Sequence, residues 1–118
     1  MDDEAEVREV VGEMVRRCGY TPVLVDNGDD AVSQVRAAAA GTPFTLVLLD
    51  LTIPGEVGGR EVVQTLLAID PTLKAVAVSG YADDPILANH RRYGFVGSVK
   101  KPFELSELSA ALQAAVKP

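Results

Sequence analysis

Residues 44–55 read FTLVLLDLTIPG, an apolar run that ends in an aspartate and then enters a Pro-Gly turn. A run without polar alternation is typical of a parallel strand that is covered on both faces. Asp50 ends this run, and a buried carboxylate is costly unless a cation or hydrogen-bond donors accompany it. Aspartate also commonly stabilises turns through local backbone bonds. The stretch alone therefore leaves two interpretations of Asp50 open, a turn residue and a reactive or cation-binding carboxylate.

Patterns of strand and helix alternate along the whole chain. Apolar residues recur at helical spacing over 4–18, 31–39, 62–69 and 105–116. Asp84 as N-cap and Pro85 at the first helical position predict a further helix over 85–93, ended by Gly94. Apolar runs typical of strands cover 22–26, 45–50, 74–79 and 97–99. Gly19 follows the first helical pattern, where a left-handed cap is expected. This alternation predicts an α/β fold, a doubly wound parallel sheet with helices on both faces.

The composition is typical of one globular domain over residues 1–118, since 47% of the residues are hydrophobic and 24% are charged. The net charge of −6 argues against direct binding to nucleic acid or to an anionic membrane, which both need clustered basic residues. We find neither a signal peptide pattern nor an apolar run of membrane-spanning length, and expect a cytoplasmic protein. Cys18 is the single cysteine, so an intramolecular disulfide is excluded and packing is its expected role.

Polar side chains follow the predicted strands at the points where they end. They are Asp26, Asp50, Ser79 and the pair Lys100 and Lys101. The carboxyl ends of parallel strands lie along one edge of a doubly wound sheet, and ligands of such folds bind there. We therefore expect the functional site at this edge.

An acidic pair, Asp2 and Asp3, directly precedes the first helix. If these carboxylates meet Asp50, the three could hold a hard cation such as Mg²⁺, which prefers oxygen ligands. Lys101 and Ser79 would then supply a positive charge and a hydroxyl donor to a phosphoryl group carried by Asp50. Such a site suits acyl-phosphate chemistry.

Over nearly its whole length the chain resembles the receiver domains of bacterial two-component response regulators. The matching residues are the acidic pair Asp2 and Asp3, Asp50 with Pro54 and Gly58 after it, Ser79, and Lys101 in KKPF. More narrowly, the sequence looks like receivers at the C-terminus of hybrid sensor histidine kinases. The resemblance implies a flavodoxin-like receiver fold with strand order 2-1-3-4-5.

The resemblance also implies a function in a histidine-to-aspartate phosphorelay. Asp50 would take a phosphoryl group from a phosphohistidine of a sensor histidine kinase or phosphotransfer domain, and the receiver would catalyse its own phosphorylation and dephosphorylation. The residues implied as Mg²⁺ ligands are Asp3, Asp50, the carbonyl of Thr52 and, through water, Asp2. Lys101 would pair with the phosphoryl oxygens, and Ser79 would act as the switch hydroxyl that changes protein contacts. Receivers of this family often pair, so a homodimer is one implied assembly.

Two features depart from the family pattern. Ser98 occupies the position three residues before Lys101 where the family usually has tyrosine or phenylalanine. The family's first strand, which ends in the acidic pair, is absent, because Met1 directly precedes Asp2. We therefore expect a receiver that is truncated at its N-terminus and lacks or replaces a central strand. An upstream extension, a tag, a rearranged sheet or another protomer would supply the strand.

Other functions and residues have plainer interpretations. A receiver-like interaction module that is not phosphorylated is the main alternative, and the missing strand and Ser98 favour it. A phosphohydrolase is disfavoured because the second acid of that class would fall on Thr52. A dinucleotide site at Asp26 lacks the glycine-rich motif. We expect His90 to be an ordinary surface residue rather than a phosphorelay histidine.

Overall fold

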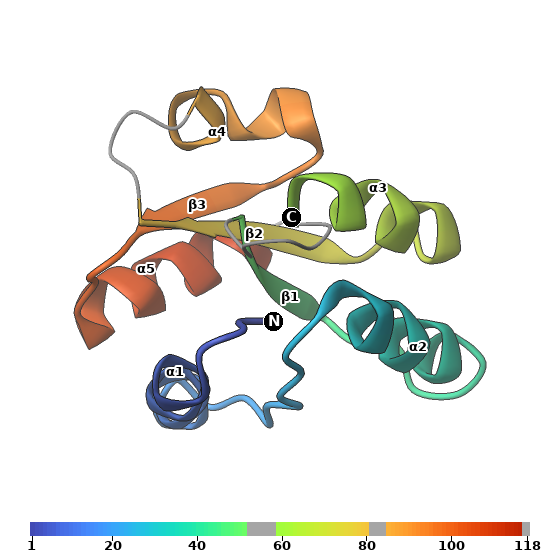
Figure 1. Cartoon of the computed structure of the whole chain (residues 1–118), viewed down its shortest axis with the longest axis horizontal. Helices are drawn as coiled ribbons and strands as arrows, with labels where there is room; N and C mark the ends of the chain where they lie inside the picture. The colour runs from blue at the N-terminus through green and yellow to red at the C-terminus, as the bar shows by residue number, and fades with distance from the viewer. Residues whose placement is uncertain (52–58, 81–84, 117–118) are drawn as a thin grey trace.

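A parallel sheet forms the centre of the molecule (Figure 1). The computed structural model describes residues 1–51, 59–80 and 85–116. Within these ranges the sheet has three strands in the order β1 (Leu46–Asp50), β2 (Lys74–Ser79) and β3 (Gly97–Lys100). All pairs are parallel, with Leu49 opposite Ala77 and Ala77 opposite Ser98. These strands confirm the three predictions at 45–50, 74–79 and 97–99.

Helices flank the sheet on both faces, as the alternating pattern predicts. They are α1 (Ala5–Arg17), α2 (Gly28–Ala39), α3 (Gly59–Ile69), α4 (Pro85–Ala88) and α5 (Leu105–Val116), with a 3-10 helix, η1 (His90–Tyr93), after α4. The single helix predicted over 85–93 is wrong, because Asn89 leaves helical geometry at φ −129° and ψ 44° and separates α4 from η1. Gly19 and Gly94 end α1 and η1 with φ of 94° and 96°, values that favour glycine.

One face of the sheet packs against α2, α3 and α4. Its core joins side chains of these helices to Leu49 of β1 and to Ala75 and Ala77 of β2. Phe95, which is 1% exposed, belongs to the same core. The small alanines of β2 allow the large side chains of α3 to approach the sheet closely.

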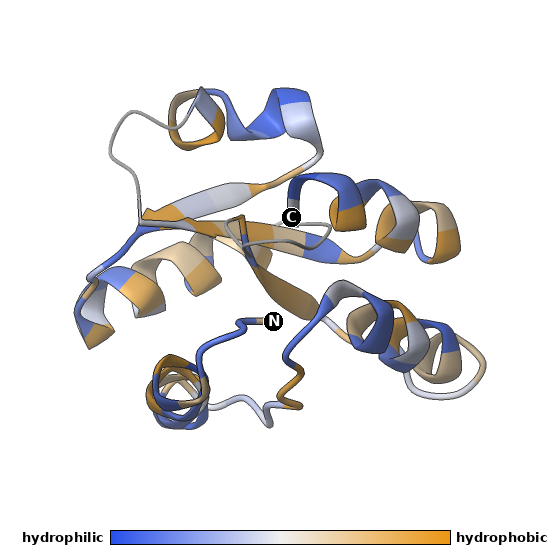
Figure 2. Ribbon diagram, in the orientation of Figure 1, coloured by the Kyte–Doolittle hydropathy of each residue, from blue (hydrophilic) through white to orange (hydrophobic). Residues whose placement is uncertain are grey.

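The other face of the sheet packs against α5. Val76 and Val78 of β2, alternate to the alanines, lie with Val99 and Ala115 in a second core. α1 packs beside α5 on this side of the molecule (Figure 1). In Figure 2 the strand β1 is mostly apolar, as a strand covered on both faces requires. The predicted doubly wound α/β class is confirmed.

The strand predicted over 22–26 is wrong, because this segment has no strand structure. In the family's order it would pair with the first strand, which the described residues do not contain, and a strand needs a paired neighbour to satisfy its backbone groups. Among the described residues, the segment makes one backbone hydrogen bond to another segment, from the Asp2 N–H to the Val25 carbonyl at 3.2 Å. The observed strands thus correspond to the last three strands of the order 2-1-3-4-5.

Two further predictions, on Cys18 and on membrane-spanning segments, can be compared with the structure. Cys18 is a half-buried free cysteine at the C-terminal end of α1 rather than a core residue, since the helix ends there and turns at Gly19. Within the described ranges, no helix is both long and apolar enough to span a membrane.

Candidate functional site

Asp50 is the last residue of β1 and is only 4% exposed. Its backbone N–H donates to the carbonyl of Met1 at 3.1 Å, and the next residue, Leu51, donates to Val78 of β2 at 2.9 Å. The strand end is therefore held from both sides. These bonds place the carboxylate at the carboxyl edge of the sheet, where the sequence predicts the site.

Lys101 joins two acidic residues from distant parts of the chain. Its Nζ lies 2.7 Å from Oδ2 of Asp2 and 2.9 Å from Oδ2 of Asp50. Burial by itself lowers the pKa of Lys101, but hydrogen bonds to Asp2 and Asp50 and their negative charges outweigh burial and raise it above its ordinary value. The lysine therefore stays an ammonium ion at neutral pH.

Asp2 is 7% exposed and is held in place by hydrogen bonds from Glu4, which directly precedes α1, and from Arg8 of α1. Its Oδ1 accepts a hydrogen bond from the Glu4 N–H at 3.0 Å, and its carbonyl accepts one from Arg8 at 2.9 Å. The sequence reasoning missed Arg8 as a positioning residue. The feature of the sequence that could have identified Arg8 is its position one helical turn inside α1, shortly after the acidic pair.

Met1 also takes part in the site, which the sequence reasoning did not foresee. Its α-ammonium donates to the carbonyl of Leu48 at 2.8 Å, while its own carbonyl accepts from Asp50. Burial lowers the pKa of this α-ammonium, although the nearby charges of Asp2 and Asp50 act in the opposite direction. Met1 thus continues the sheet for one residue beside β1.

Ser79 ends β2 and is fully buried. Its carbonyl accepts a hydrogen bond of 2.7 Å from the backbone N–H of Lys101. This bond extends the hydrogen-bond ladder between β2 and β3 by one residue past the end of β3. The position of Ser79 therefore fixes where the lysine leaves the sheet.

Three carboxylates come close enough to share a cation. One oxygen from each of Asp2, Asp3 and Asp50 lies within 4.8 Å of the others, with Asp3 exposed and the other two buried. An oxygen-only set of three carboxylates fits a hard divalent ion such as Mg²⁺. The ammonium of Lys101 at two of these carboxylates shows that the position favours positive charge. Thr52, the fourth expected ligand, and the motif residues Pro54 and Gly58 lie outside the described residues.

Gly59 begins α3 directly against the strand that carries Asp50. A Cβ at this position would lie 2.8 Å from the Asp50 carbonyl oxygen and 2.9 Å from the Leu49 Cβ. Both distances are too short for any residue but glycine without a backbone shift. In the sequence, Gly59 is the second of two consecutive glycines. This pair was the feature that could have predicted a position without room for a side chain.

Other predicted candidates lie apart from this cluster. Asp26 is exposed and accepts a hydrogen bond from the neighbouring Asn27 at 2.6 Å, and Lys100 is exposed at the end of β3. His90 is half-buried in η1, and its Nδ1 is buried without a hydrogen-bond partner among the described residues. The prediction of an ordinary surface histidine is therefore wrong in part, since packing of η1 covers one edge of the ring. Ser98 donates to the Leu87 carbonyl of α4 at 3.3 Å.

Comparisons with known proteins agree with this geometry. The family of response regulator receiver domains matches residues 1–113. Sporulation initiation phosphotransferase F of Bacillus subtilis (strain 168) is 26% identical over 113 residues, which are 96% of this chain and 87% of that protein. A response regulator receiver protein of Anaeromyxobacter sp. (strain Fw109-5) is 31% identical over 102 residues, which are 86% of this chain and 41% of that protein. The chain thus spans less than half of the latter relative.

Solved structures show the same fold. A LuxR-family two-component response regulator from Aurantimonas sp. SI85-9A1 has a TM-score of 0.79 at 27% identity, with 98% of this chain and 80% of that chain covered. The receiver domain of a sensor histidine kinase from Pseudomonas aeruginosa PAO1 has a TM-score of 0.80 at 24% identity, with 98% and 93% covered. That structure is described with a magnesium ion coordinated in its active site cleft.

The fold and the acidic edge with its lysine define the class of two-component signalling proteins. Within this class, the chain belongs to the response regulator receiver domain family.

Proposed function

We propose that residues 1–118 form one receiver domain in which Asp50 accepts a phosphoryl group from a phosphohistidine. The observation that carries the proposal is the contact of the Lys101 ammonium with both Asp2 and Asp50 at the carboxyl edge of the sheet. Three distant segments of the chain converge there around one strand-end carboxylate. The donor would be a sensor histidine kinase or a phosphotransfer domain.

In the transfer, a carboxylate oxygen of Asp50 forms a bond to phosphorus while the bond between phosphorus and the donor imidazole nitrogen breaks. The imidazole leaves with the electron pair of that bond and is protonated. Lys101, held at 2.9 Å from Asp50 before the reaction, is placed to pair with the oxygens of the incoming group. Its raised pKa favours the charged form that this role needs.

Asp2, Asp3, Asp50 and Thr52 would hold Mg²⁺, and the bound ion would neutralise negative charge on the phosphoryl group. The donor chemistry of the three described carboxylates supports this assignment. Without a dication, their clustered charge would disfavour an approaching phosphoryl anion.

Ser79 is the proposed switch hydroxyl. It lies at the end of the strand next to Asp50, and its carbonyl already positions Lys101. A phosphoryl group on Asp50 would attract its hydroxyl as a hydrogen-bond donor and thereby bias the protein contacts made near the end of β2. Attachment to a hybrid sensor histidine kinase stays a prediction.

The test is the intact mass of the protein after incubation with Mg²⁺ and acetyl phosphate. We expect one phosphoryl group on the wild-type chain and on Asp26→Asn, a matched change at an exposed aspartate outside the site. Asp50→Asn should gain none. The gain should also disappear when EDTA removes Mg²⁺.

Equal labelling of the wild type and Asp50→Asn would contradict the assignment of the acceptor. A complete lack of labelling, with folding confirmed by circular dichroism and with a kinase donor also ineffective, would favour the unphosphorylated interaction module instead.

A further inference from the structure

Residues 85–103 contain no aspartate or glutamate, although the chain has 17 of them and a net charge of −6. The basic residues of this stretch are Arg91, Arg92, Lys100 and Lys101. Lys101 belongs to the site at the carboxyl edge, whereas Arg91 and Arg92 are exposed side chains of η1. Neither arginine forms an ion pair within the part of the chain that the structure describes. The charge of the chain is therefore unevenly distributed, and η1 is a local positive region.

The geometry of η1 presents both arginines to solvent. A 3-10 helix has about three residues per turn, so residues three positions apart lie on the same side. His90 and Tyr93 are half-buried and form the inner side, whereas Arg91 and Arg92 form the outer side. The turn is closed by the bond from the Gly94 N–H to the Arg91 carbonyl at 3.2 Å. The backbone that carries the two arginines is therefore held in place.

α3 contributes a third arginine to the same side of the molecule. The guanidinium carbon of Arg60 lies 4.9 Å from the centre of the Tyr93 ring, and Arg60 is itself exposed. One turn further along α3, the Gln64 side chain donates to the Tyr93 carbonyl at 3.0 Å. Figure 2 shows hydrophilic residues both in η1 and at the start of α3. Because Arg92 directly precedes Tyr93, the ring joins the guanidinium of Arg60 to the turn that carries Arg92.

The position of Arg60 prepares its side chain to bind a carboxylate. A guanidinium above an aromatic ring uses its face for that contact, while its N–H groups point outward in its plane. These N–H groups match the two oxygens of a carboxylate. Among the described residues, no acidic side chain forms an ion pair with Arg60. Because the ring restricts the side chain before a partner arrives, less conformational entropy is lost on binding.

We propose that Arg60, Arg91, Arg92 and the Tyr93 ring form an arginine surface that binds an acidic segment of a partner protein. Each carboxylate of such a segment pairs with one guanidinium. The net charge of the chain favours a short acidic segment over nucleic acid or an anionic membrane. Those larger anions extend beyond the arginine surface and are repelled by the acidic remainder of the chain.

The arginine surface is distinct from the proposed phosphoryl chemistry, so its test needs neither Mg²⁺ nor a phosphoryl donor. The probe is a fluorescein-labelled peptide of about eight residues in which glutamate alternates with glycine, and it spans about 26 Å when extended. The matched control peptide has glutamine in place of each glutamate. Fluorescence anisotropy measures the binding of both peptides to the wild-type chain at about 0.05 M salt and again at about 0.5 M.

We expect saturable binding of the glutamate peptide, at least about tenfold weaker in the higher salt and at least about tenfold weaker for the glutamine peptide. Arg60→Gln and Arg92→Gln should each weaken binding about fourfold, because each removes one exposed ion pair. Arg60→Lys should weaken it about twofold, since lysine keeps the charge but not the fork of donors.

The matched control variant is Arg36→Gln, which changes an exposed arginine of α2 outside the arginine surface. It should alter binding by less than about 1.5-fold, because salt screens a distant charge. NMR signals of the arginine Nε–H groups locate the bound peptide. The signals of Arg60, Arg91 and Arg92 should shift on binding, and that of Arg36 should not.

The proposal is overturned if the folded wild type shows no saturable binding, or if the glutamine peptide binds equally well. Equal losses in Arg36→Gln and Arg92→Gln would also overturn it, because binding would then follow the total charge rather than this surface. Tighter binding of a single-stranded oligonucleotide of the same charge would show that the partner is a nucleic acid instead. All the substituted arginines are exposed, so circular dichroism should show that every variant is folded.

Discussion

Among single residues, the site depends most on Lys101, whose ammonium lies between two buried carboxylates. Asp2 and Asp50 are 7% and 4% exposed, and both contact Lys101. A buried carboxylate that loses its partner keeps the full cost of its burial. Lys101 therefore has a structural role besides the chemical one proposed for it.

We predict that Lys101→Met lowers the free energy of unfolding at pH 7 by about 1 to 3 kcal/mol, less than for a fully buried pair because the lysine is partly exposed. Lys100→Met, the same change at the exposed neighbouring residue, should alter it by less than about 0.5 kcal/mol. Urea unfolding followed by circular dichroism measures both. Equal effects of the two variants would show that the contacts of Lys101 contribute nothing to folding.

The pH dependence of this contribution follows from the raised pKa of Lys101. A group whose pKa is raised on folding contributes fully below its unfolded value and loses the contribution as pH rises through the folded value. The stability difference between wild type and Lys101→Met should thus be constant from neutral pH to about pH 10 and shrink above the ordinary lysine value of 10.5. Urea titrations at a series of pH values test this, and a difference that grows above pH 10.5 would contradict it.

At the scale of elements, the site depends on how closely α3 approaches β1. Gly59 starts the helix where a Cβ would meet the Asp50 carbonyl at 2.8 Å. The contact is with backbone, which cannot rotate away as a flexible side chain can. The first turn of α3 and the strand end that carries Asp50 are thereby held together.

We predict that Gly59→Ala destabilises the protein by about 1 to 3 kcal/mol, because the helix must move away from the strand. Gly41→Ala is the control, since a Cβ there meets nothing within 4 Å and its φ is not in the left-handed region. The control should change stability by less than about 0.5 kcal/mol. Thermal unfolding distinguishes the two variants, and a neutral Gly59→Ala would mean that α3 can shift at little cost.

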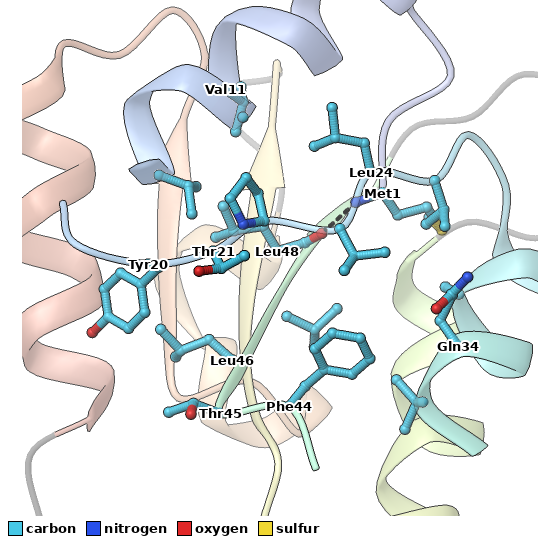
Figure 3. Close-up of a pocket in the computed structure, with 18 of the residues that line it drawn as sticks. Met1, Val11, Tyr20, Thr21, Leu24, Gln34, Phe44, Thr45, Leu46 and Leu48 are labelled. Carbon is cyan, nitrogen blue, oxygen red and sulfur yellow. Dashed lines mark hydrogen bonds between the residues drawn. The ribbon is translucent and has the colours of Figure 1, made fainter. Parts of the chain in front are cut away.

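At the scale of the whole molecule, the sheet is paired unevenly. Among the described residues, β2 is bonded to a strand on each side, whereas part of the other edge of β1 faces an apolar groove that the segment 20–25 also lines (Figure 3). Local opening is easiest where backbone bonds are few. We therefore expect stability to decrease across the sheet from β2 toward the segment 20–25.

We predict that amide protection alternates along β1. The register sets Val47 and Leu49 into the ladder with β2, so their amides should exchange at least about tenfold more slowly than those of Leu46 and Leu48, which face the groove. Native-state hydrogen exchange followed by NMR measures all four in one sample. Uniform protection from Leu46 to Leu49 would mean that the groove edge is paired in solution.

The periodicity of the sequence was enough to predict α1, α2, α3, α5 and the three observed strands, because local burial patterns decide these elements. It was not enough for 85–93, where the backbone leaves helical geometry at the exposed Asn89, or for 22–26. A strand exists only when a neighbour pairs with it, and no local pattern contains that information.

The amino-acid pattern was sufficient to predict the α/β class and to point to the carboxylates, the hydroxyl and the lysine that follow the strands. Covered parallel strands need continuous apolar runs, so polar residues at their ends are conspicuous. Three features became visible only in the folded chain: Lys101 lies between Asp2 and Asp50, Met1 extends the sheet, and a groove lies beside β1. These features join residues far apart in the chain, so they depend on packing and on backbone pairing across the sheet rather than on any local stretch.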